Sequence, residues 1–294
     1  MDTIVIIPCF KVKYKILNVI KKSLEYFDLL ICVDDCCPEN SGDHILKNIK
    51  SERVIVIKHS HNKGVGGALK TGFKYASKFK PRVIVKLDGD NQIYPNDAKG
   101  IADFLIKSDL DYIVGSRFKL KNNSKNIPIF RWYGNRLISF ISKISSGLYH
   151  MDDFLNGLIA IKFKQLKKLK VKEMKDDFLF ETDLLFKISD QNLKTSSYPM
   201  KIKYFKNNSN FNPTKEFLKF MIFNLKNFIL RIIKSYFLKD IKLGSFLIML
   251  FLFFSFAAIK DFFMFNFIFN INSSLAIYFL SLFFVIDVLE KKGQ

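Results

Sequence analysis

Two acidic residues, one residue apart, are the feature of this sequence best suited to chemistry. Asp88 and Asp90 flank Gly89 directly after the apolar run Val83–Leu87. Both carboxylates would lie where a buried strand ends and could hold a divalent cation from one side. Mg²⁺ and Mn²⁺ prefer such oxygen ligands and keep positions open for phosphate oxygens, and Gln92 is close enough to complete the shell. The pattern predicts a Mg²⁺ or Mn²⁺ site that binds a diphosphate and stabilises charge on a leaving nucleoside diphosphate.

A second acidic pair follows another apolar run. Asp34 and Asp35 come directly after Leu29–Val33. An isolated Asp-x-Asp is commonly a solvated turn, but two acidic strand ends in one chain favour a shared site. In open α/β sheets, ligands bind at the carboxyl ends of the strands.

A glycine-rich turn occupies residues 61–68, with Lys63 and Gly64 before an expected helix. The amides and positive end of a helix suit a phosphate, or the turn allows close backbone approach. The alternative is a dinucleotide site of the Rossmann type, which needs Gly-x-Gly-x-x-Gly after the first strand. Pro8 and its neighbours stand there instead, and Leu69 occupies the place of the third glycine. The sequence therefore disfavours an oxidoreductase.

The elements around these motifs alternate between short β-branched strands and amphipathic helices. We expect strands at Thr3–Ile7, Leu29–Val33, Val54–Ile57 and Val83–Leu87, and helices at Ile16–Phe27 and Ala68–Lys78. This alternation predicts an α/β fold with a mostly parallel sheet.

Charge and cysteine spacing narrow the function classes. The net charge is +20, and the segment Lys201–Lys242 is especially basic. Its lysines alternate with Phe, Leu and Ile and carry no nucleic-acid-binding motif, so we expect an anionic membrane surface and no nucleic acid as partner. The four cysteines lack zinc-site spacing and are expected to be free thiols. No signal peptide is expected at the N-terminus.

The last third of the chain has the composition of a membrane anchor. We expect amphipathic helices in the interface plane over Thr214–Lys239, a buried core helix being the alternative. Leu243–Ile259 and Ser273–Leu289 are candidate spans, the second less regular. The predicted domains are a catalytic domain at residues 1–212, basic interfacial helices at 213–242 and a transmembrane hairpin at 243–294.

In order and spacing, the motifs resemble those of family 2 glycosyltransferases, and within them the polyprenyl-phosphate sugar transferase (dolichyl-phosphate mannosyltransferase-like) group. The resemblance is carried by Ile7–Lys11, Val33–Asp35, Asn62–Ala68, Asp88–Gln92, Gly115–Phe118, Arg131–Ser139, Asp153–Gly157, Phe180–Asp183 and Pro199-Met200. It implies a nucleotide-diphospho-sugar transferase (GT-A-like) fold. The chain departs from the family pattern at Asn91, at Cys36-Cys37 and after Asp153, where proline is usual.

The resemblance also implies roles for individual residues. The nucleotide-pocket residues would be Pro8, Asp34, Asp35, Lys63, Gly64, Asp88, Gly89 and Asp90, with Asp88, Asp90 and Gln92 at the metal. Catalytic roles fall to Asp90, Asp153, Arg117 and Arg131. The arginines would contact phosphate through their forked donors, and Asp153 would lie near the acceptor. The alternatives are surface salt bridges for the arginines and a helix cap for Asp153.

The prediction is a membrane-associated, metal-dependent, inverting hexosyltransferase that moves a sugar from a nucleotide-diphospho-sugar to a polyprenyl phosphate. The alternative is a family 2 enzyme that elongates a lipid-linked glycan or surface polysaccharide. A hydroxyl acceptor would need a base, for which Asp153, Glu181 and Asp183 are the candidates. A non-catalytic membrane adaptor is the remote alternative. We expect a multi-pass protein of the bacterial inner membrane with its catalytic domain in the cytoplasm, and leave homo-oligomers open.

Overall fold

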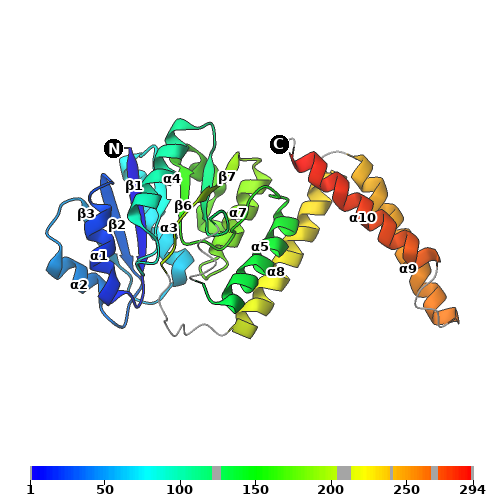
Figure 1. Cartoon of the computed structure of the whole chain (residues 1–294), viewed down its shortest axis with the longest axis horizontal. Coiled ribbons are helices and arrows are strands. Elements are labelled where there is room, and N and C mark those ends of the chain that lie inside the picture. Colours follow the sequence, from blue (N-terminus) through cyan, green and yellow to red (C-terminus); the bar gives the residue numbers. More distant parts are fainter. Residues whose placement is uncertain (1, 121–126, 204–212, 239–240, 266–270, 293–294) are drawn as a thin grey trace. The chain divides into compact units, whose positions relative to one another are not determined.

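The computed structural model describes residues 2–120, 127–203, 213–238, 241–265 and 271–292 (Figure 1). The chain forms two compact units. The first comprises residues 1–143 and 150–216, and the second comprises residues 144–149 and 217–294.

A seven-stranded sheet forms the centre of the first unit. Its strands are β1 (Thr3–Cys9), β2 (Leu29–Asp34), β3 (Val54–Lys58), β4 (Val83–Lys86), β5 (Tyr112–Ser116), β6 (Ile159–Lys162) and β7 (Thr195–Pro199). Their order is β3-β2-β1-β4-β6-β5-β7. Only β6 runs antiparallel to its neighbours, β4 and β5. The expected mostly parallel sheet is confirmed.

Helices follow most of the strands. In the first unit they are α1 (Lys13–Ser23), α2 (Ser41–Asn48), α3 (Gly64–Ala76), α4 (Pro95–Lys107), α5 (Ile129–Ser146, whose last residues belong to the second unit), α6 (Phe163–Leu166) and α7 (Phe180–Asp190). The expected helix at Ala68–Lys78 begins four residues earlier, because the glycine-rich turn already forms the first turn of α3. The helix expected at Ile16–Phe27 is Lys13–Ser23.

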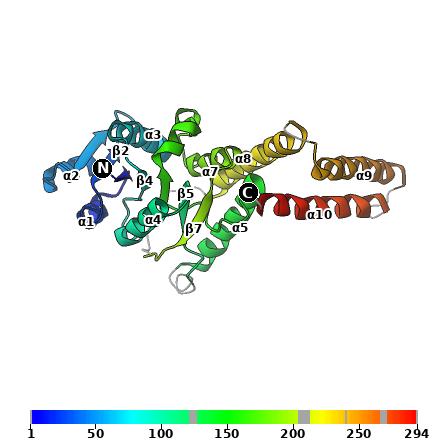
Figure 2. The ribbon, with the colours of Figure 1, turned by 90° about the horizontal axis from the view of Figure 1, so that it is seen from above.

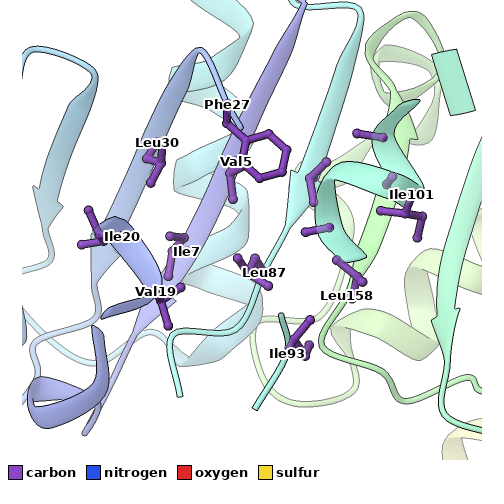
Figure 3. Close-up of a cluster of buried hydrophobic side chains, with 14 of the residues drawn as sticks. Val5, Ile7, Val19, Ile20, Phe27, Leu30, Leu87, Ile93, Ile101 and Leu158 are labelled. Carbon is purple, nitrogen blue, oxygen red and sulfur yellow. The ribbon is translucent and has the colours of Figure 1, made fainter. Parts of the chain in front are cut away.

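Alternating side chains of the central strands form the core. Val5, Ile7 and Leu30 pack with Val19 of α1 and Ile101 of α4 on one face of the sheet (Figure 3). On the other face α3 lies against β1 and β2. There a side chain at Gly72 would come within 2.4 Å of Ile6, so glycine allows the close approach. These contacts fix the strand ends that carry the acidic pairs.

The second unit is helical. It contains α8 (Pro213–Ile233), a short π-helix (Lys234–Leu238), α9 (Leu243–Phe265) and α10 (Ile271–Lys292). The first residues of α8, before Phe217, belong to the first unit. Helices α9 and α10 run side by side (Figure 2). In the part of the chain that the structure describes, two segments are long and apolar enough to cross a membrane: Leu243–Asp261, with a mean hydropathy of 2.1, and Ile271–Lys291, with 1.8. Only 17% of each is buried, which indicates association with a membrane.

Candidate active site

The ends of β1, β2 and β4 lie next to one another and surround a cavity of about 440 Å³. Its lining is Pro8, Cys9, Phe10, Val12, Asp35, Asn62, Gly64, Val65, Ala68, Asp88, Gly89, Asp90, Asp177 and Phe178. We call it the donor cavity. The structure thus brings together six of the predicted nucleotide-pocket residues. Lys63 and Asp34 do not line it, and neither do Gln92, Arg117 and Asp153.

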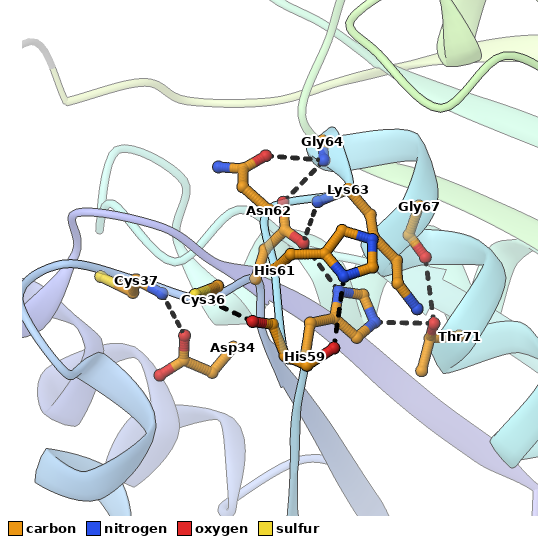
Figure 4. Close-up of polar contacts among 12 residues, drawn as sticks. Asp34, Cys36, Cys37, His59, His61, Asn62, Lys63, Gly64, Gly67 and Thr71 are labelled. Carbon is orange, nitrogen blue, oxygen red and sulfur yellow. Dashed lines mark hydrogen bonds and ion pairs between the residues drawn. The ribbon is translucent and has the colours of Figure 1, made fainter.

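Asp35 holds the glycine-rich turn in place. One of its carboxylate oxygens accepts from the Lys63 amide at 2.8 Å, and the other accepts from the Gly64 amide at 2.8 Å. His59 Nδ1 lies 2.7 Å from Asp35, while its Nε2 lies 2.8 Å from the hydroxyl of Thr71 (Figure 4). Both amides donate to Asp35 in this structure, and the phosphate contact predicted for the turn stays a prediction. A carboxylate here also suits the positive end of α3.

The turn does make the close backbone approach that its glycines allow. Gly64 has a φ of +82°, and a side chain there would come within 2.5 Å of the Asp176 carbonyl oxygen. Gly67 donates its amide to that same oxygen at 3.1 Å. The turn thus supports the segment at residues 175–178, of which Asp177 and Phe178 line the donor cavity.

Asp34 folds the loop that follows β2. It is 4% exposed, and one of its oxygens accepts from the Cys37 amide at 2.7 Å (Figure 4), while the other accepts from the Gly42 amide at 2.5 Å. The first of these holds the loop, and the second fixes the start of α2. Asp34 does not line the donor cavity, and its predicted place in the nucleotide pocket stays a prediction.

Asp88 belongs to a buried ionic cluster. The side chain of Lys86 is 2% exposed, and its ammonium group lies 2.9 Å from Asp88 and also bonds to Glu181. Burial alone would lower the pKa of Lys86, yet the two carboxylates raise it above its ordinary value, so this lysine is a cation at neutral pH. Burial raises the pKa of Glu181, while the charge of Lys86 opposes that shift. A side chain on Gly157 would come within 1.8 Å of Asp88, so the backbone at Gly157 also positions this carboxylate.

Asp90 carries the clearest electrostatic signal for a cation. Burial, and then the negative charge of Asp88, raise the pKa of Asp90 to about 6, although the Gln92 amide donates to it at 3.1 Å. A divalent cation would relieve this repulsion, so the two carboxylates fit the predicted metal. Among the described residues no group of three or more His, Cys, Asp or Glu side chains is arranged for a metal. Water and the diphosphate would then supply further ligands.

Arg117 and Asp153 form an ion pair with each other. The guanidinium bonds to Asp153 through two nitrogens at 2.7 and 2.6 Å and to the Leu155 carbonyl at 2.7 Å. Asp153 is fully buried and also accepts from Asn156 at 2.9 Å. Arg117 therefore forms a largely buried ion pair instead of the alternative surface salt bridge, and Asp153 is its partner instead of a helix cap. Asp153 is poorly placed to serve as a base in this arrangement, and the phosphate contact of Arg117 stays a prediction. The Arg131 side chain lies outside the described residues.

Some site residues were missed by the sequence analysis. The sequence pattern indicates Lys86 only as part of an apolar strand, although a lysine at a buried position needs a carboxylate partner. His59 was not assigned a role, and its bond to Asp35 depends on the fold alone. Asp183 accepts the amide of Lys175 at 3.0 Å, which makes it a support for the 175–178 segment, while Glu181 faces the site. All four cysteines are free, as expected.

Comparisons with known proteins agree with this architecture. The family model described as glycosyl transferase family 2 matches residues 4–169. An uncharacterised protein of Methanocaldococcus jannaschii is 30% identical over 69% of this chain and 82% of its own length. The UDP-N-acetylglucosamine–dolichyl-phosphate N-acetylglucosaminyltransferase of Methanococcus voltae is 34% identical over 56% of this chain and 70% of its own length.

A solved structure shares the fold. Glucosyl-3-phosphoglycerate synthase from Mycobacterium tuberculosis, in complex with Mn²⁺, uridine diphosphate and glucosyl-3-phosphoglycerate, superimposes with a TM-score of 0.58. The match has 14% sequence identity and covers 78% of this chain and 79% of that one. It supports the predicted nucleotide-diphospho-sugar transferase (GT-A-like) fold. This chain belongs to glycosyl transferase family 2.

Proposed function

We propose that the enzyme transfers a sugar from a nucleotide-diphospho-sugar to a polyprenyl phosphate, with inversion at the sugar. The observation that carries the proposal is the donor cavity, where Asp88 and Asp90 face Pro8, Asp35 and Gly64. The dolichyl-phosphate transferase among the relatives supports a polyprenyl phosphate as acceptor. In the reaction, an acceptor phosphate oxygen bonds to the anomeric carbon while the bond from that carbon to the nucleoside diphosphate breaks.

Asp88 and Asp90 would hold Mg²⁺ or Mn²⁺, with Gln92 beside them. When bound, the cation would supply positive charge that stabilises the leaving diphosphate. Lys86 keeps the carboxylate of Asp88 in place and compensates the charge of Glu181. The nucleotide-pocket roles of Pro8, Asp34, Asp35, Lys63, Gly64 and Gly89 are part of this proposal, with Asp34 and Lys63 acting through the loops that they hold.

No strong base is required for a phosphate acceptor. The pKa of its second ionisation is about 6, so the attacking oxygen is already an anion and positioning supplies much of the catalysis. This agrees with the arrangement of the acidic groups, since Asp153 is paired with Arg117 and Glu181 with Lys86. We propose that Arg117 and Arg131 lie on the acceptor side and contact its phosphate.

The elongation of a lipid-linked glycan is the second candidate, and one observation favours it. Burial raises the pKa of Glu181, as it does for carboxylates that act as bases near neutral pH. The ion pair with Lys86 opposes this role. An enzyme of this kind would use a hydroxyl acceptor and would need Glu181 or another carboxylate to remove its proton.

We propose residues 1–212 as catalytic domain, 213–242 as interfacial helices and 243–294 as a membrane hairpin. The apolar side chains Leu218, Ile222 and Leu225 of α8 are each more than 60% exposed, as expected for a helix lying on a membrane. The basic residues that precede α9, and Lys291 and Lys292 at the end of α10, favour a cytoplasmic catalytic domain and C-terminus. The membrane would be the bacterial inner membrane or, given the archaeal relatives, its archaeal counterpart.

The test is thermal unfolding of the purified protein with a panel of nucleotide sugars and Mg²⁺ or Mn²⁺. A donor that binds the folded state raises the melting temperature, and we expect one donor class to do so only with metal. The variant Asp90→Asn should keep the melting transition and lose the metal-dependent part. The proposal is wrong if no nucleotide sugar stabilises the protein or if the variant responds like the wild type.

A further inference from the structure

A second cavity lies in the first unit and shares no lining residue with the donor cavity. Its volume is about 560 Å³, within the range of small-molecule sites. The C-terminal half of α3 forms one wall, and residues 163–173 form the other. Its lining is Lys70, Phe73, Lys74, Ser77, Phe163, Leu166, Lys167, Lys170, Val171, Lys172 and Glu173. We call it the basic cavity.

The floor of the basic cavity is apolar. Phe73, Phe163 and Leu166 are 4%, 7% and 6% exposed, and the ammonium of Lys167 lies 4.9 Å from the ring centre of Phe163. In a chain of this charge, a group of lysines is ordinarily a solvated surface without a cavity. The cavity that these aromatic rings line leaves room for an apolar body instead.

The rim of the basic cavity is positively charged beyond what its carboxylate can balance. Five lysines and one glutamate line it. Lys170 lies 3.7 Å from Glu173, and Lys70 lies 2.9 Å from Asp176. Lys74 and Lys172 are exposed, and no carboxylate of the described residues lies within ion-pair distance of either. The two ammonium groups are therefore available to an anion.

We propose that the basic cavity binds a small soluble anion with an aromatic or aliphatic body and a phosphate group, and that this ligand weakens donor binding. The body would rest on Phe73 and Phe163, and the phosphate would bond to Lys74 and Lys172. Phosphate is preferred to a monoanion because a site with excess charge gains more from a dianion.

The coupling to the donor cavity follows from Lys70. This side chain lines the basic cavity, pairs with Asp176 and donates to the Met174 carbonyl. Asp176 accepts the Gly67 amide through its own carbonyl, and the next two residues line the donor cavity. Lys70 lies one helical turn from Lys74 on α3. A phosphate bound to Lys74 therefore also attracts Lys70, competes with Asp176 for it and so loosens the 175–178 segment. This second part rests on the proposed donor cavity, whereas the binding site does not.

The test uses phenyl phosphate, a soluble aromatic dianion, titrated calorimetrically into the full-length protein in detergent. We expect phenyl phosphate to bind more tightly than inorganic phosphate. The double variant Lys74→Glu/Lys172→Glu should weaken its binding about ten-fold or more, because charged hydrogen bonds are lost. The matched control is Lys47→Glu/Lys107→Glu, which changes two exposed lysines at the ends of α2 and α4 and should leave binding unchanged.

The donor side is measured with uridine diphosphate and Mn²⁺. Saturating phenyl phosphate should raise the dissociation constant of the nucleotide about five-fold or more in the wild type and leave it unchanged in Lys74→Glu/Lys172→Glu. An equal effect in both proteins would show direct competition in the donor cavity and overturn the coupling. Equal phenyl phosphate affinity in the wild type, the cavity variant and the control would overturn the site itself, whatever the outcome for the donor.

Discussion

Replacing Lys86 by methionine tests whether the buried ionic cluster holds the site together. Methionine keeps an unbranched apolar side chain, one heavy atom shorter than that of lysine, and removes the charge. The carboxylates of Asp88 and Glu181 then lose the cation between them, while Lys86 itself is only 2% exposed. Removal of one partner from a buried ion pair costs about 3–5 kcal/mol, because a buried charge is left uncompensated. Asp88 faces the donor cavity and retains some solvent, so we expect the lower end, about 3 kcal/mol.

The loss of folding stability in Lys86→Met should depend on pH, and the carboxylates determine whether it grows or shrinks as the pH falls. The pKa of Lys86 is raised, so its stabilisation is present below the unfolded value and is lost only as the pH rises through the folded one. Between pH 5 and 8 the lysine stays charged. In Lys86→Met, the pKa of Glu181, already raised by burial, rises further. Since the folded variant then binds a proton more tightly than the unfolded chain, it regains stability as the pH falls.

Chemical unfolding followed by the fluorescence of Trp132, the one tryptophan of the chain, provides the assay. The matched control is Lys58→Met, which removes a surface pair with Asp43 whose side chains are 44% and 62% exposed. Such a pair contributes under about 1 kcal/mol. If Lys86→Met and Lys58→Met cost the same at pH 7.5, or if the cost of Lys86→Met does not shrink at pH 5, the reasoning about the cluster is refuted.

Three further predictions follow from other parts of the chain. The pKa of Asp90 in the folded protein is about 6, so its carboxylate destabilises the fold increasingly as the pH rises from about 4 to 6. Asp90→Asn should therefore raise the metal-free melting temperature at pH 7.5, and an unchanged or lower melting temperature would contradict this. Gly157→Ala should weaken metal-dependent donor binding by displacing Asp88, whereas Gly134→Ala, with no atom within 4 Å of the new methyl group, should not; calorimetry that finds both variants alike would rule out this role. A reporter fused after Gln294 should give a cytoplasmic signal, and a signal from the opposite side would exclude the hairpin.

Much of the fold could be predicted because its local patterns are strong. The apolar strands β1, β2 and β4 ended close to where their β-branched runs ended, and acidic residues marked the edge of the sheet that carries the site. The antiparallel β6 could not be predicted, because its place between β4 and β5 depends on contacts distant in sequence. The start of α3 was placed late, because glycine is a poor helix former and the packing against residues 175–176 is not visible in the local sequence.

The site was predictable as a set of residue types more than as a set of contacts. The cavity gathers Pro8, Asp35 and Asp90 as expected. The pairing of Arg117 with Asp153, 36 residues away, could not be inferred, since each residue alone suggested a ligand contact. The bond between Lys86 and Glu181 spans 95 residues. A lysine inside an apolar strand was the one sequence signal for it.

The central claim concerns the acceptor, and one measurement tests it directly. Purified protein in detergent, supplied with metal and a labelled form of the nucleotide sugar that stabilises it, is incubated with either a polyprenyl phosphate or a lipid-linked oligosaccharide. The account predicts transfer to the polyprenyl phosphate, giving an acid-labile glycosyl phosphate, and loss of transfer in Asp90→Asn. Transfer to the oligosaccharide alone, through an acid-stable glycosidic bond, would contradict it.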